Sequence, residues 1–165
     1  MKTNKIKTAI YIRVASHNQQ KRKSDDQEKQ LRTFASSHGY TVDEKYIYRE
    51  MGYSGILPVQ ERPQLRKVIE DARNNGFRVL MIRDISRLFR KTIPLLNFLE
   101  ELNVLGVKVV TTMGGSFDMS IPQDRFVATL MTSMAEMELH QRQGSMEKVL
   151  IVNKKTNGRN SKKAN

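Results

Sequence analysis

The sequence predicts an α/β fold: a mainly parallel sheet of about four to five strands flanked by helices, with a long C-terminal helix. Two observations predict it. Short apolar runs rich in β-branched residues alternate along the chain with segments that repeat apolar residues at helical spacing. Turn-forming residues separate these segments, and 165 residues are enough for one core but too few for two full domains.

The first strand is predicted at residues 7–14, where β-branched and aromatic side chains dominate. A polar stretch, residues 15–23, follows this strand. Ser24 with Gln27 three residues later is typical of a helix start, and Ser, His and Gly at residues 37–39 indicate where this helix ends.

The second strand is predicted at residues 41–50 and leads into a loop at residues 51–61, which contains several residues that favour turns. The second helix opens at residues 62–65 and keeps its apolar residues on one face. It ends near residues 74–76, whose Asn and Gly tolerate left-handed backbone geometry.

The alternation then repeats, with a third strand at residues 77–82, a helix at 94–105 and a fourth strand at 107–112. A final long helix is predicted from about residue 122 to 143. Its methionines are interpreted as packing or partner contacts rather than as cofactor ligands. The Lys-, Asn- and Ser-rich residues 153–165 are predicted to be disordered.

The composition excludes several classes of protein. The chain has no cysteine and three scattered histidines, so it offers neither disulfides nor an obvious metal site. No apolar run reaches the roughly 18 to 20 residues of a membrane span, and the N-terminal residues do not resemble a signal peptide. We therefore expect a cytoplasmic protein without a membrane partner.

The formal net charge of +12 predicts a polyanionic partner, because surface Lys and Arg displace counterions from phosphates. The charge is concentrated at the two ends. Residues 1–23 carry seven Lys or Arg and no acidic residue, and residues 147–165 carry six Lys or Arg and one Glu. Residues 24–146 hold 16 basic and 16 acidic residues, so an arginine cluster there would be a local feature. The plain alternative is that charged ends only keep the protein in solution.

Ligands of open α/β sheets bind at the carboxyl edge of the strands. Three polar segments are predicted to converge there: residues 13–19, the loop up to residue 62, and residues 83–91. Arg87 and Arg90 lie three residues apart, so on a helical turn two guanidinium groups point to the same side.

Such an arginine pair can hold one phosphate and balance the charge of a pentacoordinate phosphorus. The alternative for Arg87 and Arg90 is a solvated helix face. Arg13 lies within an apolar strand, and the alternative to a phosphate role for it is a structural salt bridge.

Four segments resemble, in order, the resolvase and invertase family of serine recombinases. Residues 11–19 resemble its opening signature, Tyr-x-Arg-Val-Ser-(Ser/Thr)-x-x-Gln. Residues 50–55, followed by residues 61–63, are similar to its acidic-x-Gly-x-Ser-Gly loop and its Arg-Pro. Residues 83–90 resemble Lys-Asp-Leu-Ser-Arg-Leu-Gly-Arg of the large serine recombinases, the closest group in motif. Residues 135–138 resemble an acidic stretch in the helix on which family members dimerise.

The resemblance covers about residues 7–143 and implies the N-terminal catalytic domain of a site-specific DNA recombinase. Such enzymes cut and rejoin DNA without a metal ion, through a phosphoserine intermediate. The resemblance implies no cofactor, DNA as the partner, and a homodimer that pairs into a tetramer during strand exchange. It gives phosphate-binding and catalytic roles to four arginines and supporting roles to a glutamine and a serine: Arg13, Arg62, Arg87, Arg90, Gln19 and Ser86.

The sequence departs from the family pattern at the nucleophile. With Arg13 and Gln19 held in register, the family's reactive serine aligns with Ala15, which cannot attack a phosphate. Three explanations are open. Ser16 supplies the hydroxyl, the protein is a natural inactive homologue that binds DNA or regulates a recombinase, or Ala15 was introduced to disable the enzyme. Because a loop can compensate for a shift of one residue, we favour Ser16 as the catalytic nucleophile.

A second departure is Gly144, which lies where the family's long helix continues through a Glu-Arg-Thr run. Glycine costs about 1 kcal/mol relative to alanine inside a helix, so a kink or a stop is expected there. We place the catalytic domain at residues 1–146 and a basic, disordered tail at 147–165. This tail is too short for a helix-turn-helix domain, so we expect the basic ends to make non-specific phosphate contacts.

Overall fold

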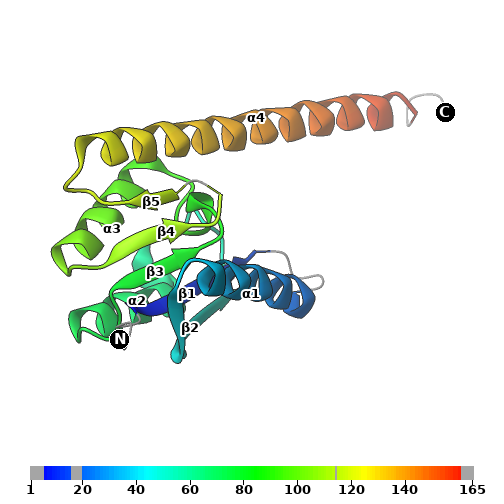
Figure 1. Cartoon of the computed structure of the whole chain (residues 1–165). Helices are drawn as coiled ribbons and strands as arrows, with labels where there is room; N and C mark the ends of the chain where they lie inside the picture. The colour runs from blue at the N-terminus through cyan, green and yellow to red at the C-terminus, as the bar shows by residue number, and fades with distance from the viewer. Residues whose placement is uncertain (1–5, 16–19, 114, 161–165) are drawn as a thin grey trace, which may run out of the picture.

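The computed structural model describes residues 6–15, 20–113 and 115–160, and its described side chains end at Arg142 and omit Leu139. Strands and helices alternate through most of the chain (Figure 1), in the order β1 (Ile6–Val14), α1 (Gln20–Ser37), β2 (Tyr40–Met51), α2 (Pro63–Arg73), β3 (Val79–Ile82), α3 (Thr92–Val104), β4 (Lys108–Thr111), β5 (Gly115–Phe117) and α4 (Pro122–Asn160). Two short 3-10 helices lie before α2 and after β3, η1 (Val59–Glu61) and η2 (Ile85–Arg87).

The five strands form one sheet in the order β2-β1-β3-β4-β5. The pairs β1–β2, β1–β3 and β3–β4 are parallel, whereas β5 pairs antiparallel with β4 at one edge. The predicted α/β fold with a mainly parallel sheet is therefore confirmed. The short edge strand β5 was not predicted.

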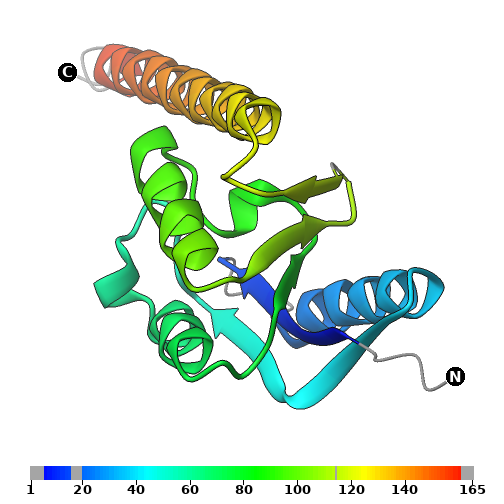
Figure 2. The same cartoon turned by 60° about the vertical axis from the view of Figure 1, so that its left-hand side comes forward.

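Helices cover both faces of the sheet (Figure 2). Successive side chains of a strand point to opposite faces, and the core divides accordingly. Ala9 and Tyr11 of β1 pack in a cluster with residues of α2 and α3. Ile10 and Ile12 pack on the other side in a second cluster, which includes Leu31 of α1. A central strand buried on both faces explains the apolar run at residues 9–12 within β1.

Helix α1 begins at Gln20, four residues before the predicted cap Ser24. Ser24 is a buried residue of the helix and not its N-terminal cap. The intervening Lys and Arg residues are good helix formers, which accounts for the extra turn.

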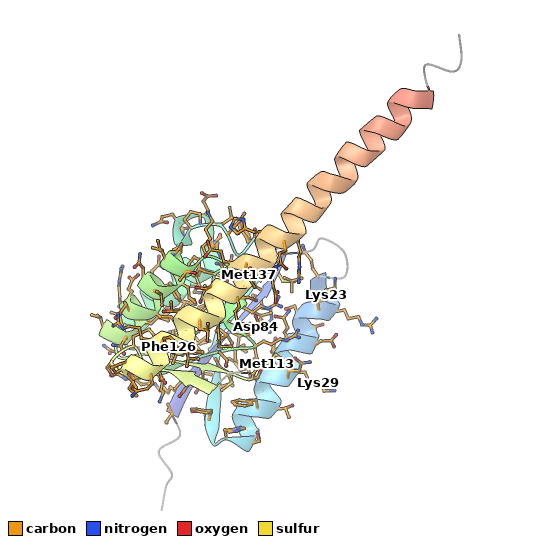
Figure 3. All side chains as sticks on the ribbon, turned by 90° about the horizontal axis from the view of Figure 1, so that it is seen from above. Lys23, Lys29, Asp84, Met113, Phe126 and Met137 are labelled. Carbon is orange, nitrogen blue, oxygen red and sulfur yellow. The ribbon has the colours of Figure 1, made fainter. Side chains whose placement is uncertain are left out.

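Helix α4 continues through Gly144 to Asn160, beyond the predicted end near residue 143. The expected kink or stop at Gly144 was therefore wrong, and the helix includes residues 153–160, which were predicted to be disordered. One glycine costs only about 1 kcal/mol, and the flanking Gln, Arg, Met, Glu and Lys residues favour helix propagation. Seen from above, α4 crosses the sheet domain and extends past it (Figure 3).

Within the described part of the chain, no helix combines the length and the apolar character that a membrane span requires.

Candidate functional site

The candidate site lies at the carboxyl edge of the sheet, where three segments meet as the sequence predicted. Strand β1 lies between β2 and β3 and runs parallel to both, so the segments that follow these strands emerge at one edge. The segments are the end of β1 at Arg13, the loop after β2 with Tyr53 and Gly55, and η2 after β3.

Arg13 ties these three segments together. Its Nε donates to the carbonyl oxygen of Arg87 at 3.0 Å, its Nη2 to that of Ser86 at 3.0 Å, and its Nη1 to that of Tyr53 at 3.1 Å. The guanidinium group of this buried residue is thus satisfied by main-chain carbonyls. Among the described residues it forms no salt bridge, which was the alternative role for this arginine.

Burial lowers the pKa of Arg13, and together with the nearby positive charges of Arg62, Arg90 and Arg87 it brings this pKa to about 10. This pKa still lies well above neutral pH, so the guanidinium group remains charged. A buried cation without a carboxylate partner leaves positive potential at the site, which favours an anionic ligand.

Arg62 lies just before α2 and has 0% of its surface exposed. Its Nη1 donates to the carbonyl oxygen of Leu88, and its Nη2 donates to that of Arg87 at 3.0 Å and to the Tyr11 hydroxyl at 2.5 Å. The guanidinium carbon lies 5.1 Å from the centre of the Phe89 ring. These contacts hold the segment that carries Arg87 and Arg90.

Glu50 of β2 contacts Arg62 and the start of α2. It is buried and lies 4.0 Å from Arg62 Nε. Its carboxylate accepts hydrogen bonds from the amides of Gln64 and Leu65, at 3.2 and 3.0 Å, in the first turn of α2, where a negative charge is favourable. Glu50 belongs to the acidic loop motif, but no role could be predicted for it, because its contact with α2 exists only in the folded chain.

Gly55 is required by the close approach of the arginines. A Cβ atom at this position would lie 2.9 Å from Nη2 of Arg13 and 3.2 Å from Cγ of Arg90. Because Arg13 is fixed by its three carbonyl partners, it cannot easily move aside. The Gly55 carbonyl oxygen also accepts a hydrogen bond of 3.0 Å from the Arg90 amide.

Asp84 orients two predicted site residues. Its carboxylate accepts a hydrogen bond from Ser86 Oγ and another of 3.1 Å from Arg87 Nε. Burial raises the pKa of Asp84, but the Ser86 hydrogen bond and the positive charge of Arg87 outweigh it, so the pKa is lower than usual. Asp84 lies within the segment of residues 83–90 that resembles the family motif, but no role was predicted for it.

Asp84→Asn is expected to destabilise the fold by about 1 kcal/mol at pH 7, because a charged acceptor is lost. The pKa of Asp84 is lower in the folded than in the unfolded chain. The charged carboxylate therefore stabilises the fold at pH values above its unfolded-state pKa, and this stabilisation is lost as the pH falls through its folded-state pKa. Urea unfolding of both proteins should therefore show a difference at pH 7 that shrinks towards pH 3. A difference that stays constant over this range would contradict the prediction.

An open cavity of about 510 Å³ lies between α1 and the arginines. Residues of β1, α1 and the segment after β3 line it: Arg13, Val14, Ala15, Lys23, Asp26, Gln27, Gln30, Arg83, Arg87 and Arg90. Figure 3 shows Asp84 between Lys23 on α1 and helix α4. The cavity thus combines several cationic groups with Ala15, the last described residue of the first loop.

Gln27 is a further residue of this cavity, and it was not predicted as a site residue. It is buried, and its Nε2 donates to the Lys23 carbonyl oxygen at 3.2 Å. Its Oε1 is buried and has no hydrogen-bond partner within the described residues. The sequence marked Gln27 only as part of a helix start.

A second, smaller cavity of about 180 Å³ lies between η2 and α4. It is lined by Ser86, Arg87, Arg90, Ala135, Glu138 and Arg142. Arg87 and Arg90 line both cavities. The Arg90 side chain forms no hydrogen bond or ion pair with any other described residue, so its guanidinium donors are available to a ligand.

Five of the seven predicted site residues are thus brought together: Arg13, Arg62, Ser86, Arg87 and Arg90. The other two, Ser16 and Gln19, lie outside the described residues. Across the ranges that the structure describes, no group of three or more His, Asp or Glu side chains is placed to hold a metal ion.

A parallel sheet with an arginine cluster at its carboxyl edge fits the resemblance to resolvase-type domains found in the sequence. Residues 8–160 match the model of the family described as the resolvase N-terminal domain. The chain therefore belongs to this family, which confirms the resemblance found in the sequence.

Known proteins agree with this assignment. A protein named resolvase from Clostridium perfringens is 30% identical over 101 residues, which are 60% of this chain and 51% of that protein. The matched region thus spans about half of its length.

Two solved structures share the fold. The N-terminal catalytic domain of TP901-1 integrase matches with a TM-score of 0.64 at 24% identity, covering 82% of this chain and 98% of that one. A resolvase family site-specific recombinase from Streptococcus pneumoniae matches with a TM-score of 0.61 at 22% identity, covering 92% and 99% of the two chains.

Proposed function

We propose that this chain is the catalytic domain of a site-specific DNA recombinase, with residues 1–146 as the domain and 147–165 as a basic extension. The proposal rests on one observation: Arg13, Arg87 and Arg90 line the same cavity, which Ala15 also lines. Membership of the resolvase N-terminal domain family supports it. The substrate is DNA, whose phosphates suit a cavity with an excess of cationic groups.

The reaction is a metal-independent transesterification, with Ser16 as the nucleophile. The Ser16 hydroxyl oxygen forms a bond to phosphorus, and the bond from phosphorus to one deoxyribose oxygen breaks. The serine proton is lost, and the departing oxygen leaves as a hydroxyl. After strand exchange, the corresponding hydroxyl at the end of the partner DNA strand attacks the phosphoserine ester. This step forms a new phosphodiester bond and returns the serine hydroxyl, so no cofactor is consumed.

The arginines divide into two kinds. Arg87 and Arg90 line both cavities and are the groups that contact the phosphate and stabilise the charge on its oxygens. Arg13 lines the larger cavity, but its guanidinium group donates to main-chain carbonyl oxygens. It therefore contributes mainly its positive charge and holds the surrounding segments in position. Arg62 is fully buried and acts as a positioning residue for the segment that carries Arg87.

Trapping on nicked duplex DNA, followed by denaturing electrophoresis, tests the function. The wild-type chain is expected to give a covalent protein–DNA band, and Ser16→Ala is expected to give none while it still binds DNA. If the wild type binds a range of nicked duplexes but never forms the band, the chain is an inactive DNA-binding or regulatory homologue. Ala15, at the position of the family's usual nucleophile, is the observation that would then explain the result.

The working form is a homodimer that associates through α4 and pairs into a tetramer during strand exchange. Large apolar side chains at helical spacing are exposed along this helix: Phe126, Val127, Leu130, Met134 and Met137. Two of them, Phe126 and Met137, are labelled in Figure 3. Such a stripe suits a second copy of the same helix. The cytoplasmic location inferred from the composition stays a prediction.

Leu130→Glu is expected to weaken the dimer strongly, because a charge would be buried in the apolar contact. Light scattering coupled to gel filtration should show a dimer for the wild type and a monomer for the variant. Val104→Glu, at an exposed apolar position at the end of α3, is the matched control and should remain dimeric. A wild-type monomer at all concentrations, or equal effects of both changes, would contradict the assignment.

A further inference from the structure

Helix α4 contacts the start of α3 through one carboxylate. Glu136 Oε2 accepts a hydrogen bond of 3.1 Å from the Thr92 amide and another of 2.8 Å from the Thr92 hydroxyl. On the same side of α4, Thr132 and Ala128 are buried against the domain. Glu136 therefore lies at the end of the buried contact between α4 and the sheet domain and adds a polar contact there.

This contact replaces a missing helix cap. The first amides of a helix have no partner within the helix, and an anion near them is favourable. At α3 the residue in the capping position is Lys91, whose side chain forms no capping hydrogen bond. Glu136 supplies the cap from another helix. The hydrogen bond from the Thr92 side chain lowers the pKa of Glu136, so the carboxylate is charged at neutral pH.

The capped residue lies two positions after Arg90. The Arg90 amide is fixed to the Gly55 carbonyl oxygen on one side, and α3 begins at Thr92 on the other. The turn of α4 that carries Glu136 also provides Ala135 and Glu138, which line the smaller cavity with Arg90. The position of α4 therefore determines the surroundings of the Arg90 guanidinium group, which no other described residue restrains.

We propose that Glu136 is a positioning residue that couples α4 to the phosphate-binding arginines. By capping α3 it holds α4 against the segment that carries Arg90 and keeps that guanidinium group facing the phosphate. A change at the α4 dimer contact would then reach Arg90 through Glu136 and Thr92. The inference rests on the proposed function, because it concerns the same arginines.

A second contact between the same helices provides a control. Arg125 of α4 pairs with Glu100 of α3, away from the start of α3. Glu100→Gln removes this ion pair, whereas Glu136→Ala removes the cap. If Glu136 served only to pack α4, both variants would change activity and stability alike.

The first measurement is the rate of adduct formation at saturating nicked DNA, together with the affinity for that DNA. Glu136→Ala is expected to slow the reaction about tenfold, because displacement of a catalytic group by about 1 Å can cost up to about a hundredfold. The affinity should change by less than about threefold, since most phosphate contacts remain. Glu136→Gln keeps a hydrogen-bond acceptor and should recover most of the rate, and Glu100→Gln should match the wild type.

The second measurement does not depend on cleavage. The Nε–Hε NMR signal of Arg90, identified by its loss in Arg90→Lys, is expected to shift in Glu136→Ala and to stay in place in Glu100→Gln. An unchanged signal in Glu136→Ala would overturn the inference whether or not the chain cleaves DNA. If the signal shifts in Glu136→Ala but the wild-type chain forms no adduct, the coupling between α4 and Arg90 is supported. Only the proposed function is then contradicted.

Discussion

Arg90→Gln is expected to slow formation of the protein–DNA adduct by about a hundredfold to a thousandfold, the usual effect of removing one group that stabilises transition-state charge. Arg90 lines both cavities, and its side chain has no partner among the described residues, so its donors are available to the phosphate. The free energy of unfolding should change by less than about 0.5 kcal/mol, because no contact within the fold is lost. Single-turnover trapping and urea unfolding measure the two effects.

The matched control for this prediction is Arg66→Gln. Arg66 is exposed on α2 and lines neither cavity, so the variant loses the same charge without touching the site. It should form the adduct at close to the wild-type rate. Equal slowing by both substitutions would mean that net charge, and not the position of Arg90, sets the rate.

Arg62→Met is expected to destabilise the fold by about 3 to 5 kcal/mol, the range typical when one member of a buried charged network is removed. The substitution removes the Arg62 donor from the carbonyl oxygen of Leu88, leaves the carbonyl oxygen of Arg87 with Arg13 alone, and leaves Glu50 without a nearby cation. Urea unfolding measures the loss. Adduct formation should fall as well, because the segment that carries Arg87 and Arg90 is no longer held.

Arg73→Met is the control for this second prediction. Arg73 also lies on α2 and pairs with Glu101 at 2.8 Å, but both side chains are largely exposed. Its loss should cost less than about 1 kcal/mol, as for most surface ion pairs. A variant Arg62→Met that is as stable as Arg73→Met would show that the buried contacts of Arg62 do not hold the segment.

Local patterns in the sequence were sufficient to predict the alternating strands and helices. The strand is apolar from Ala9 to Ile12 because it is buried on both faces, and such a run is visible in the sequence. The three-residue strand β5 lacks such a signal, since its Gly115 has a φ of 82° and only Phe117 is fully buried. The continuation of α4 past Gly144 depends on neighbouring residues outweighing one unfavourable glycine.

The candidate site was predictable in its residue types but not in their roles. Spacing and resemblance singled out Arg87 and Arg90, which line the cavities. They could not show that Arg62 points inward to carbonyl oxygens, because burial depends on the folded chain. Glu50 and Glu136 lie in segments that resemble family motifs, but the local sequence gives no sign of their contacts with α2 and Thr92, which are distant along the chain.

The central claim is that Ser16 attacks DNA at the arginine-lined cavity, and peptide mass analysis of the trapped adduct tests it most directly. Trypsin cuts after Arg13 and Lys21 and releases residues 14–21, in which Ser16 is the only residue with a hydroxyl group. This peptide is expected to carry the mass of the attached nucleotide. An adduct on any other peptide, or no adduct from a chain that binds the nicked DNA, would contradict the claim.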